Sequence, residues 1–289
     1  MVVAVERVRI PVGVEMFNAR VSGPADGPLV LLLHGFPQTS AMWRRQLEAL
    51  GGAGFRAVAP DQRGYSPGAR PDDDERYVLD RLVADVLAMA DEMGGHTFHL
   101  LGHDWGGMVA WRLAQRHPHR LRTLTVLSTP HPAALRRALA GEGGSDQRRR
   151  SAYIALFRAP GAAQALAAAD GAGLRQLFSS TGLPAGEEQP HLEVLADAGA
   201  ISAALAWYRA NDVEVLASSE PVSSPTLFVW GNDDPALGPE AARFTADHVE
   251  GPYRFEVLDG VGHWIAETAP EQLERLLMEH LDGPPAPPR

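Results

Sequence analysis

The stretch GHDWGG at residues 102–107 decides the fold. It follows a short apolar run at 97–101 (TFHLL), which predicts a buried strand, and it leads into 107–115, where apolar residues recur at helical spacing. A sharp turn between a strand and a helix strains the residue at its tip, and the residues two places before and after the tip must be small. Both are glycine here. The pattern therefore predicts a nucleophile elbow with Asp104 at its tip.

Similar apolar runs recur on both sides of this elbow. Runs of this kind suit strands that are buried on both faces, as in a parallel sheet. Helical spacing between several of them, at 78–93, 107–115 and 271–281, predicts a mostly parallel, doubly wound α/β sheet. The alternating residues 1–17 predict a further strand pair. The runs are 28–33 (PLVLLL), 55–60 (FRAVAP), 97–101 (TFHLL), 121–127 (LRTLTVL), 226–230 (TLFVW) and 253–258 (YRFEVL).

The alternation of strands and helices stops in the middle of the chain. Residues 133–220 hold alanine-rich helical segments and turn clusters in place of buried strands. We interpret 133–220 as a helical cap inserted into a core made of 1–132 and 221–289. The arginines at 148–150 are expected to form a solvated patch, and the proline-rich end (DGPPAPPR) is expected to be disordered.

Composition excludes several kinds of chemistry. The 289 residues include no cysteine, so disulfides and thiolate nucleophiles are excluded. All 26 basic residues are arginine, which excludes a Schiff-base lysine and the lysine of a phosphate-binding loop. A net charge of -10 disfavours nucleic acid and anionic lipid as partners. Neither a signal peptide nor a membrane-spanning run is evident, so we expect a cytoplasmic protein.

Two backbone donors and two polar side chains complete the predicted site. In an elbow fold, one oxyanion N–H comes from the residue after the nucleophile and one from the loop after an earlier strand. These are Trp105 and, in HGFP at 34–37, Phe36. His263 alone among the 11 histidines lies just past the last strand and after an acid-bearing strand end. Asp234, in WGNDD at 230–234, is the expected acid that orients it, and its neighbour Asp233 remains a rival.

The segments HGFP, DQRGYSPG, GHDWGG, WGNDD and GHW resemble those of epoxide hydrolases in the α/β-hydrolase superfamily, and the resemblance covers nearly the whole chain. It implies an α/β-hydrolase fold with a helical cap. It also implies two cap tyrosines that bind the epoxide oxygen. Of five tyrosines, only Tyr153 and Tyr208 fall in the predicted cap. One departure stands out, because Arg158 replaces the glutamine that usually follows the cap phenylalanine.

The resemblance implies a covalent mechanism without metal or cofactor. The Asp104 carboxylate would attack an epoxide carbon, the tyrosines would protonate the leaving oxygen, and His263 would activate water to release a vicinal diol. The expected partners are therefore a small neutral epoxide and water. A homodimer is compatible with these features. The expected pocket wall consists of His34, Pro37, Trp43, Trp207 and Trp264.

Two other functions remain open at this point. Haloalkane dehalogenases share the aspartate nucleophile, and Trp105 with Trp207 could serve as halide donors. Phe36 stands where those enzymes often carry an asparagine, which favours the epoxide interpretation. A non-catalytic small-ligand-binding protein of the same fold is the other alternative. The complete set of expected catalytic residues disfavours it.

Overall fold

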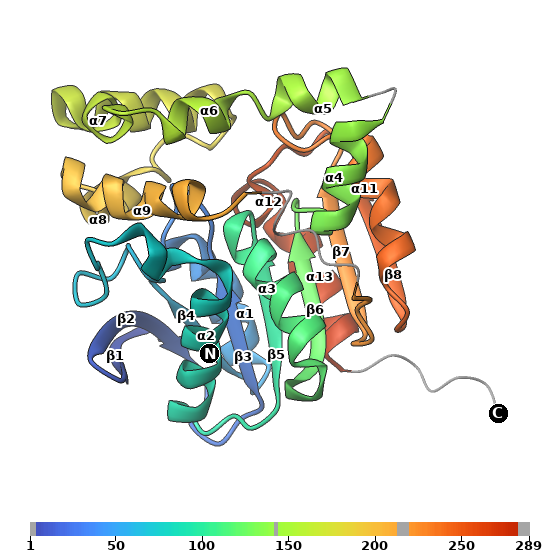
Figure 1. Cartoon of the computed structure of the whole chain (residues 1–289). Coiled ribbons are helices and arrows are strands. Elements are labelled where there is room, and N and C mark those ends of the chain that lie inside the picture. The colour runs from blue at the N-terminus through green and yellow to red at the C-terminus, as the bar shows by residue number, and fades with distance from the viewer. Residues whose placement is uncertain (1–3, 142–143, 213–219, 283–289) are drawn as a thin grey trace.

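The computed structural model describes residues 4–141, 144–212 and 220–282. Eight strands form one sheet in the order β1-β2-β4-β3-β5-β6-β7-β8 (Figure 1). Strands β3 to β8 are parallel to one another, and the β1–β2 hairpin joins β4 in antiparallel fashion. The predicted strands and the mostly parallel sheet are confirmed. The strands are β1 (Glu6–Val12), β2 (Glu15–Ser22), β3 (Leu29–Leu33), β4 (Arg56–Pro60), β5 (Phe98–His103), β6 (Leu121–Leu127), β7 (Thr226–Gly231) and β8 (Tyr253–Leu258).

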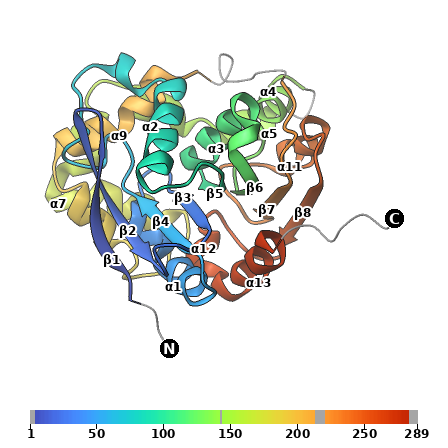
Figure 2. The same ribbon diagram turned by 90° about the horizontal axis from the view of Figure 1, so that it is seen from below.

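Helices cover both faces of this sheet, which explains why the central strands are apolar throughout. Every residue of β3 and β5 is buried. Helices α1 and α13 lie on one face, and α2, α3 and α11 lie on the other (Figure 2). The doubly wound arrangement is therefore confirmed. The helices outside the segment between β6 and β7 are α1 (Arg44–Gly52), α2 (Leu79–Glu92), α3 (Trp105–Arg116), α11 (Pro239–Phe244), α12 (Ile265–Thr268) and α13 (Pro270–Leu281).

The helices between β6 and β7 form an insertion above the carboxyl ends of the strands (Figure 1). Its first helix, α4, packs on the core beside α11, where Leu135 meets Leu237 and Ala241. The division into a core and a cap at 132/133 and 220/221 stays a prediction, and the tail at 283–289 lies outside the described residues. The insertion comprises α4 (Pro132–Ala140), α5 (Gly144–Arg150), α6 (Tyr153–Arg158), α7 (Ala162–Ser180), α8 (Gln189–Val194) and α9 (Ala198–Ala210).

The sheet topology determines where a site can form. Strand β3 lies between β4 and β5 in the sheet. The chain runs from β3 to its neighbour β4 on one side and then crosses over to β5 on the other side, so the strand order reverses at β3. Open α/β sheets bind ligands outside the carboxyl ends of their strands at such a reversal. The loops after β3 and β5 carry Phe36 and Asp104 to this point, directly below the insertion.

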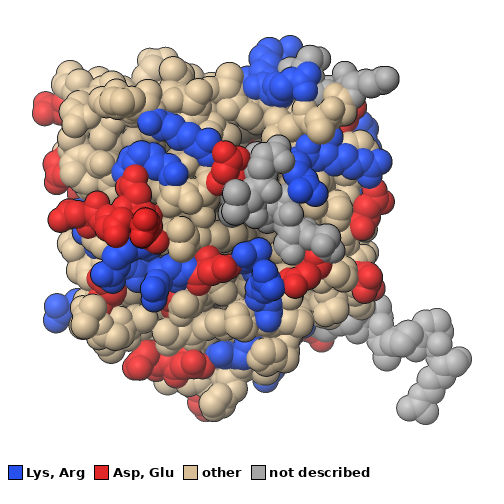
Figure 3. Space-filling view, in the orientation of Figure 1, with Lys and Arg blue, Asp and Glu red and all other residues tan. Residues whose placement is uncertain are grey.

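The surface is charged but mixed. On the face in Figure 3, arginine side chains lie interspersed with aspartate and glutamate. Ion pairs such as Arg209–Asp74 and Arg112–Asp80 join many of them. Among the described ranges, no helix has both the length and the apolar character needed to cross a membrane.

Candidate active site

Asp104 occupies the tip of a tight turn between β5 and α3. Its backbone angles, φ 51° and ψ −121°, lie where few residues other than glycine are found. A Cβ on Gly102 would lie 2.3 Å from the carbonyl oxygen of Gly106, and a Cβ on Gly106 would lie 2.3 Å from that of Leu33. The turn is closed by Thr129, whose hydroxyl donates to the Asp104 carbonyl at 2.9 Å. The strand–turn–helix geometry is therefore the one that GHDWGG predicts.

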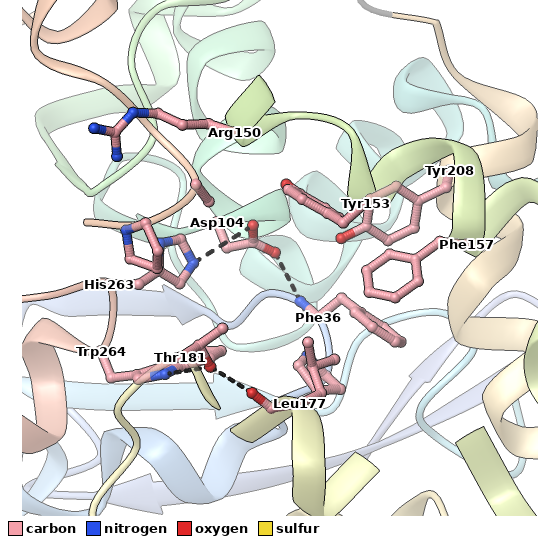
Figure 4. Close-up of a pocket in the computed structure, with 13 residues that line it drawn as sticks. Phe36, Asp104, Arg150, Tyr153, Phe157, Leu177, Thr181, Tyr208, His263 and Trp264 are labelled. Carbon is pink, nitrogen blue, oxygen red and sulfur yellow. Dashed lines mark hydrogen bonds and ion pairs between the residues drawn. The ribbon is translucent and has the colours of Figure 1, made fainter. Parts of the chain in front are cut away.

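Backbone donors hold the Asp104 carboxylate. The Phe36 N–H donates to Oδ1 at 2.8 Å (Figure 4), and the Trp105 N–H also interacts favourably with the carboxylate. Gly35 must lack a side chain, because its Cβ would lie 2.3 Å from that same Oδ1. Burial raises the pKa of Asp104, and His263 and the two N–H donors offset only part of this rise. The two donors thus favour the ionised form of Asp104.

His263 faces Asp104 from the loop after β8. Its Nε2 lies 3.8 Å from Asp104 Oδ2, and its Nδ1 lies 2.8 Å from Asp234 Oδ2. Asp234 is buried, and its other oxygen accepts the backbone N–H groups of Ala236 and Leu237. Asp233 is exposed instead. Burial lowers the pKa of His263, but the carboxylates of Asp234 and Asp104 outweigh it and raise this pKa to about 9.

Two further side chains fix the backbone of His263. His103 Nε2 and the Ser128 hydroxyl donate to its carbonyl oxygen at 3.0 and 2.9 Å. His103 thus supports the backbone of His263. Nearby, the side-chain amide of Gln38 donates to Glu267, an acid that sequence reasoning missed. Burial raises the pKa of Glu267 to about 8, opposed by Gln38.

Tyr153 and Tyr208 approach Asp104 from the insertion. Tyr153 is the first residue of α6, Tyr208 lies in the last turn of α9, and their ring centroids are 6.4 Å apart. Figure 4 shows both hydroxyls turned toward the Asp104 carboxylate. Burial raises the pKa of both phenols, and the negative charge of Asp104 raises it further. Both tyrosines therefore remain neutral hydrogen-bond donors at neutral pH.

Two cavities reach this group. One has a volume of about 130 Å³ and the other about 120 Å³, and both reach Asp104, Tyr153 and Tyr208. The first is mostly apolar, and Pro37 and Trp264 are among the residues that line it. Its lining residues are Phe36, Pro37, Asp104, Arg150, Tyr153, Phe157, Leu177, Thr181, Tyr208, Pro235, Ala236, His263 and Trp264.

The expectation that His34, Trp43 and Trp207 line this cavity is wrong. His34 is fully buried, and its Nε2 accepts the Gln62 N–H at 3.1 Å. Trp43 lies in the apolar core between the sheet and the helices α1 and α13. Trp207 is also buried, and its indole N–H donates to the Arg63 carbonyl at 2.9 Å. The sequence places each of these residues at a strand end or on a helix, but that position does not determine the direction of the ring.

Conversely, several cavity residues were not anticipated. Phe157 lies one helical turn after Tyr153, and the pair Leu177 and Thr181 shows the same spacing. Such i, i+4 neighbours share a helix face, so spacing from Tyr153 could have indicated Phe157. Arg150 corrects the expectation of a solvated patch. It is partly buried, lines the cavity and donates to the Asp234 carbonyl at 2.6 Å.

The arrangement brings together a buried carboxylate with backbone N–H donors, an imidazole that is hydrogen-bonded to a second carboxylate, and two phenol hydroxyls. Within 4–141, 144–212 and 220–282, no three His, Cys, Asp or Glu side chains gather as metal ligands. The model of the "alpha/beta hydrolase fold" family matches residues 28–270. The chain therefore belongs to the alpha/beta hydrolase fold family.

Several of its relatives are named epoxide hydrolases. Epoxide hydrolase A of Mycobacterium tuberculosis is 33% identical over 91% of this chain and 92% of its own length. Mouse (Mus musculus) epoxide hydrolase 4 is 31% identical over 92% of this chain and 76% of its own. A solved structure described as novel epoxide hydrolases from metagenomes of hot environments superposes with a TM-score of 0.84, at 29% identity over 98% and 99% of the two chains. Together these relatives support a hydrolase enzyme.

Proposed function

We propose that this enzyme hydrolyses epoxides to vicinal diols through a covalent ester on Asp104. The observation that carries the proposal is the opposition of two phenol hydroxyls and a buried carboxylate across one small cavity (Figure 4). An epoxide placed there would meet the nucleophile at a ring carbon and the donors at its oxygen. The names of the curated relatives support the same substrate class.

Ring opening is the first step. An Asp104 oxygen forms a bond to one epoxide carbon while the bond from that carbon to the ring oxygen breaks. The departing alkoxide is strongly basic, so it takes a proton from Tyr153 or Tyr208. Both phenols have a raised pKa and therefore hold their protons until the alkoxide develops. The product of this step is a hydroxyalkyl ester of Asp104 and one tyrosinate.

Hydrolysis is the second step. His263, oriented by Asp234, takes a proton from water as the water oxygen attacks the Asp104 carbonyl carbon. The resulting oxyanion faces the N–H groups of Phe36 and Trp105. The ester bond then breaks, and the leaving diol oxygen takes the proton from His263. The new carboxylic acid of Asp104 returns its proton to the tyrosinate, which restores the enzyme.

The walls of the cavity favour a small neutral substrate. Phe157, Leu177 and Trp264 supply apolar surface, and the Arg150 guanidinium points away from Asp104 toward Asp146 and the Asp234 carbonyl (Figure 4). A carboxylate on the substrate would therefore find no cation directed at it from this residue. A cytoplasmic location and a homodimer stay predictions.

Halide displacement by the same nucleophile is the alternative reaction. It requires N–H donors for the leaving halide, and Trp207 was the residue expected to accompany Trp105. The Trp207 indole N–H already donates to the Arg63 carbonyl, which argues against that role. The phenol pair, by contrast, matches the needs of an alkoxide leaving group.

A panel of neutral epoxides and haloalkanes tests the proposal. We expect diol formation from terminal or aryl epoxides, such as styrene oxide, to exceed halide release from haloalkanes by orders of magnitude. Efficient chloride or bromide release without diol formation would replace the proposal with the dehalogenase alternative. Turnover of neither substrate class would favour the non-catalytic alternative.

A further inference from the structure

Arg158 joins the two helices that carry the tyrosines. It is the last residue of α6, which Tyr153 begins. Its Nε donates to the carbonyl oxygen of Tyr208 at 2.7 Å, and its Nη2 donates to the carbonyl oxygen of Asn211, also at 2.7 Å. One guanidinium thus spans from the helix of the first tyrosine to the backbone of the second.

The carbonyls that Arg158 binds lie at a helix end that needs a partner. The last four carbonyl groups of a helix lack partners within it, and this end carries partial negative charge. Helix α9 ends at Ala210, so the Tyr208 carbonyl belongs to this group. The planar guanidinium fork can satisfy two acceptors at fixed angles, which a flexible amine cannot do equally well.

The same end of α9 is also bonded to the segment that begins α2. The Asn211 side chain accepts the Leu79 N–H at 2.8 Å and donates to the carbonyls of Tyr77 and Trp207 at 2.9 Å each. Asn211 therefore connects the end of α9, and with it Tyr208, to the core. Arg158 extends this connection to α6, and hence to Tyr153.

Phe157, the residue before Arg158, packs against the rings of both tyrosines. Its ring centroid is 5.3 Å from that of Tyr153 and 5.2 Å from that of Tyr208. Aromatic pairs prefer certain ring arrangements but occur over a range of separations. The two directed hydrogen bonds of Arg158 add a constraint on the backbone that carries Tyr208.

We propose that Arg158 is a positioning residue that holds Tyr153 and Tyr208 in register for ring opening. Arg158 also lines the second cavity and pairs with Asp212 at 3.6 Å, but its hydrogen bonds go to backbone carbonyls and not to Asp104 or to either phenol. The inference rests on the proposed function, because it assigns a consequence only to the step that uses the phenols. Ester hydrolysis, which depends on His263, is not expected to need it.

The test isolates ring opening in a His263→Gln background, where the ester accumulates and intact-protein mass spectrometry follows its formation from styrene oxide. Arg158→Ala should slow adduct formation by about tenfold or more, since misplacement of about 1 Å can cost a hundredfold. Arg158→Gln can still reach one carbonyl and should recover part of the rate. If the alanine protein does not fold, the glutamine and lysine variants carry the comparison.

Arg209→Gln is the matched control. Arg209 lies on α9 beside Tyr208 and loses a bidentate ion pair with Asp74 when replaced, but its contacts do not involve α6. It should leave adduct formation within about twofold of the parent rate, as expected for an exposed pair. Equal slowing by the Arg158 and Arg209 variants would overturn the inference and indicate a general loss of stability.

A double-mutant cycle separates this inference from the proposed function. In a Tyr153→Phe/Tyr208→Phe background, Arg158→Ala should change the rate by less than about twofold, because there are no phenols left to position. A full effect there overturns the positioning role. If the double phenylalanine variant itself opens epoxides at the parent rate, then the phenol step of the proposed function fails instead.

Discussion

The half of the site that the sheet carries differs from the half that the insertion carries. Asp104, Asp234 and His263 stand on turns at strand ends, where glycines and hydrogen bonds between side chains and backbone leave little freedom. Tyr153 and Tyr208 stand on helices that touch through aromatic rings and through Arg158. In the first half many hydrogen bonds fix the turns, whereas in the second half the two helices meet mainly through ring packing and one arginine. The sheet half should therefore be the more rigid, and the insertion half the more sensitive to substitutions outside the site.

The largest expected effect comes from His263→Gln. A carboxylate is already ionised and needs no base to attack, so this variant should open the epoxide once and then stop, with turnover lost by several orders of magnitude. Intact-protein mass spectrometry should show the mass of one added substrate, and peptide mapping should place it on Asp104. Asp104→Asn is the control and should initially show no adduct. A His263→Gln protein that binds epoxide yet forms neither adduct nor diol would contradict the covalent scheme.

Removing the phenols should have the next largest effect. Tyr153→Phe/Tyr208→Phe leaves Asp104 and His263 intact but withdraws the proton donors from the leaving oxygen. Ring opening should slow by about a hundredfold or more. Stopped-flow or quench measurement of one turnover provides the rate. An unchanged rate would show that the insertion supplies walls but no acid, and it would favour the dehalogenase alternative.

A smaller effect is expected on the titration of His263. Its pKa is raised to about 9, and the Asp104 carboxylate is one of the groups that raise it. Neutralising that charge, by Asp104→Asn or by ester formation, should lower the pKa. Once the ester has formed, the imidazole is therefore neutral down to a lower pH. The neutral imidazole is the form that takes a proton from water in the hydrolysis step. NMR titration of the imidazole in both proteins measures the difference, and an equal or higher pKa in the asparagine variant would contradict this electrostatic role.

The smallest effect on activity should follow from Trp43→Phe. Trp43 lies in the core on the sheet face that α1 and α13 cover, and its indole nitrogen has no hydrogen-bond partner among the described residues. Turnover should stay within about twofold, and the free energy of unfolding should fall by about 1–3 kcal/mol through lost packing. Steady-state kinetics and urea unfolding measure both. A large rise in KM would restore Trp43 to the substrate pocket.

The sheet half was largely predictable because its residues follow strict local rules. GHDWGG predicts the elbow since only glycine fits beside the tip, and the apolar runs place Asp104 and His263 at strand ends. The order of strands then brings those ends together. Both tyrosines were also predicted from the sequence, but through the resemblance to epoxide hydrolases and not through a local rule.

Tertiary structure alone decided the directions of side chains. The turn after β7 buries Asp234 against His263 and leaves its neighbour Asp233 exposed, a choice that depends on backbone angles not encoded in the pair itself. Packing between distant elements turned Trp43 and Trp207 away from the cavity and brought Leu177 and Thr181 to it. Sequence pattern places a residue on an element, but the packing of elements against one another decides what its side chain meets.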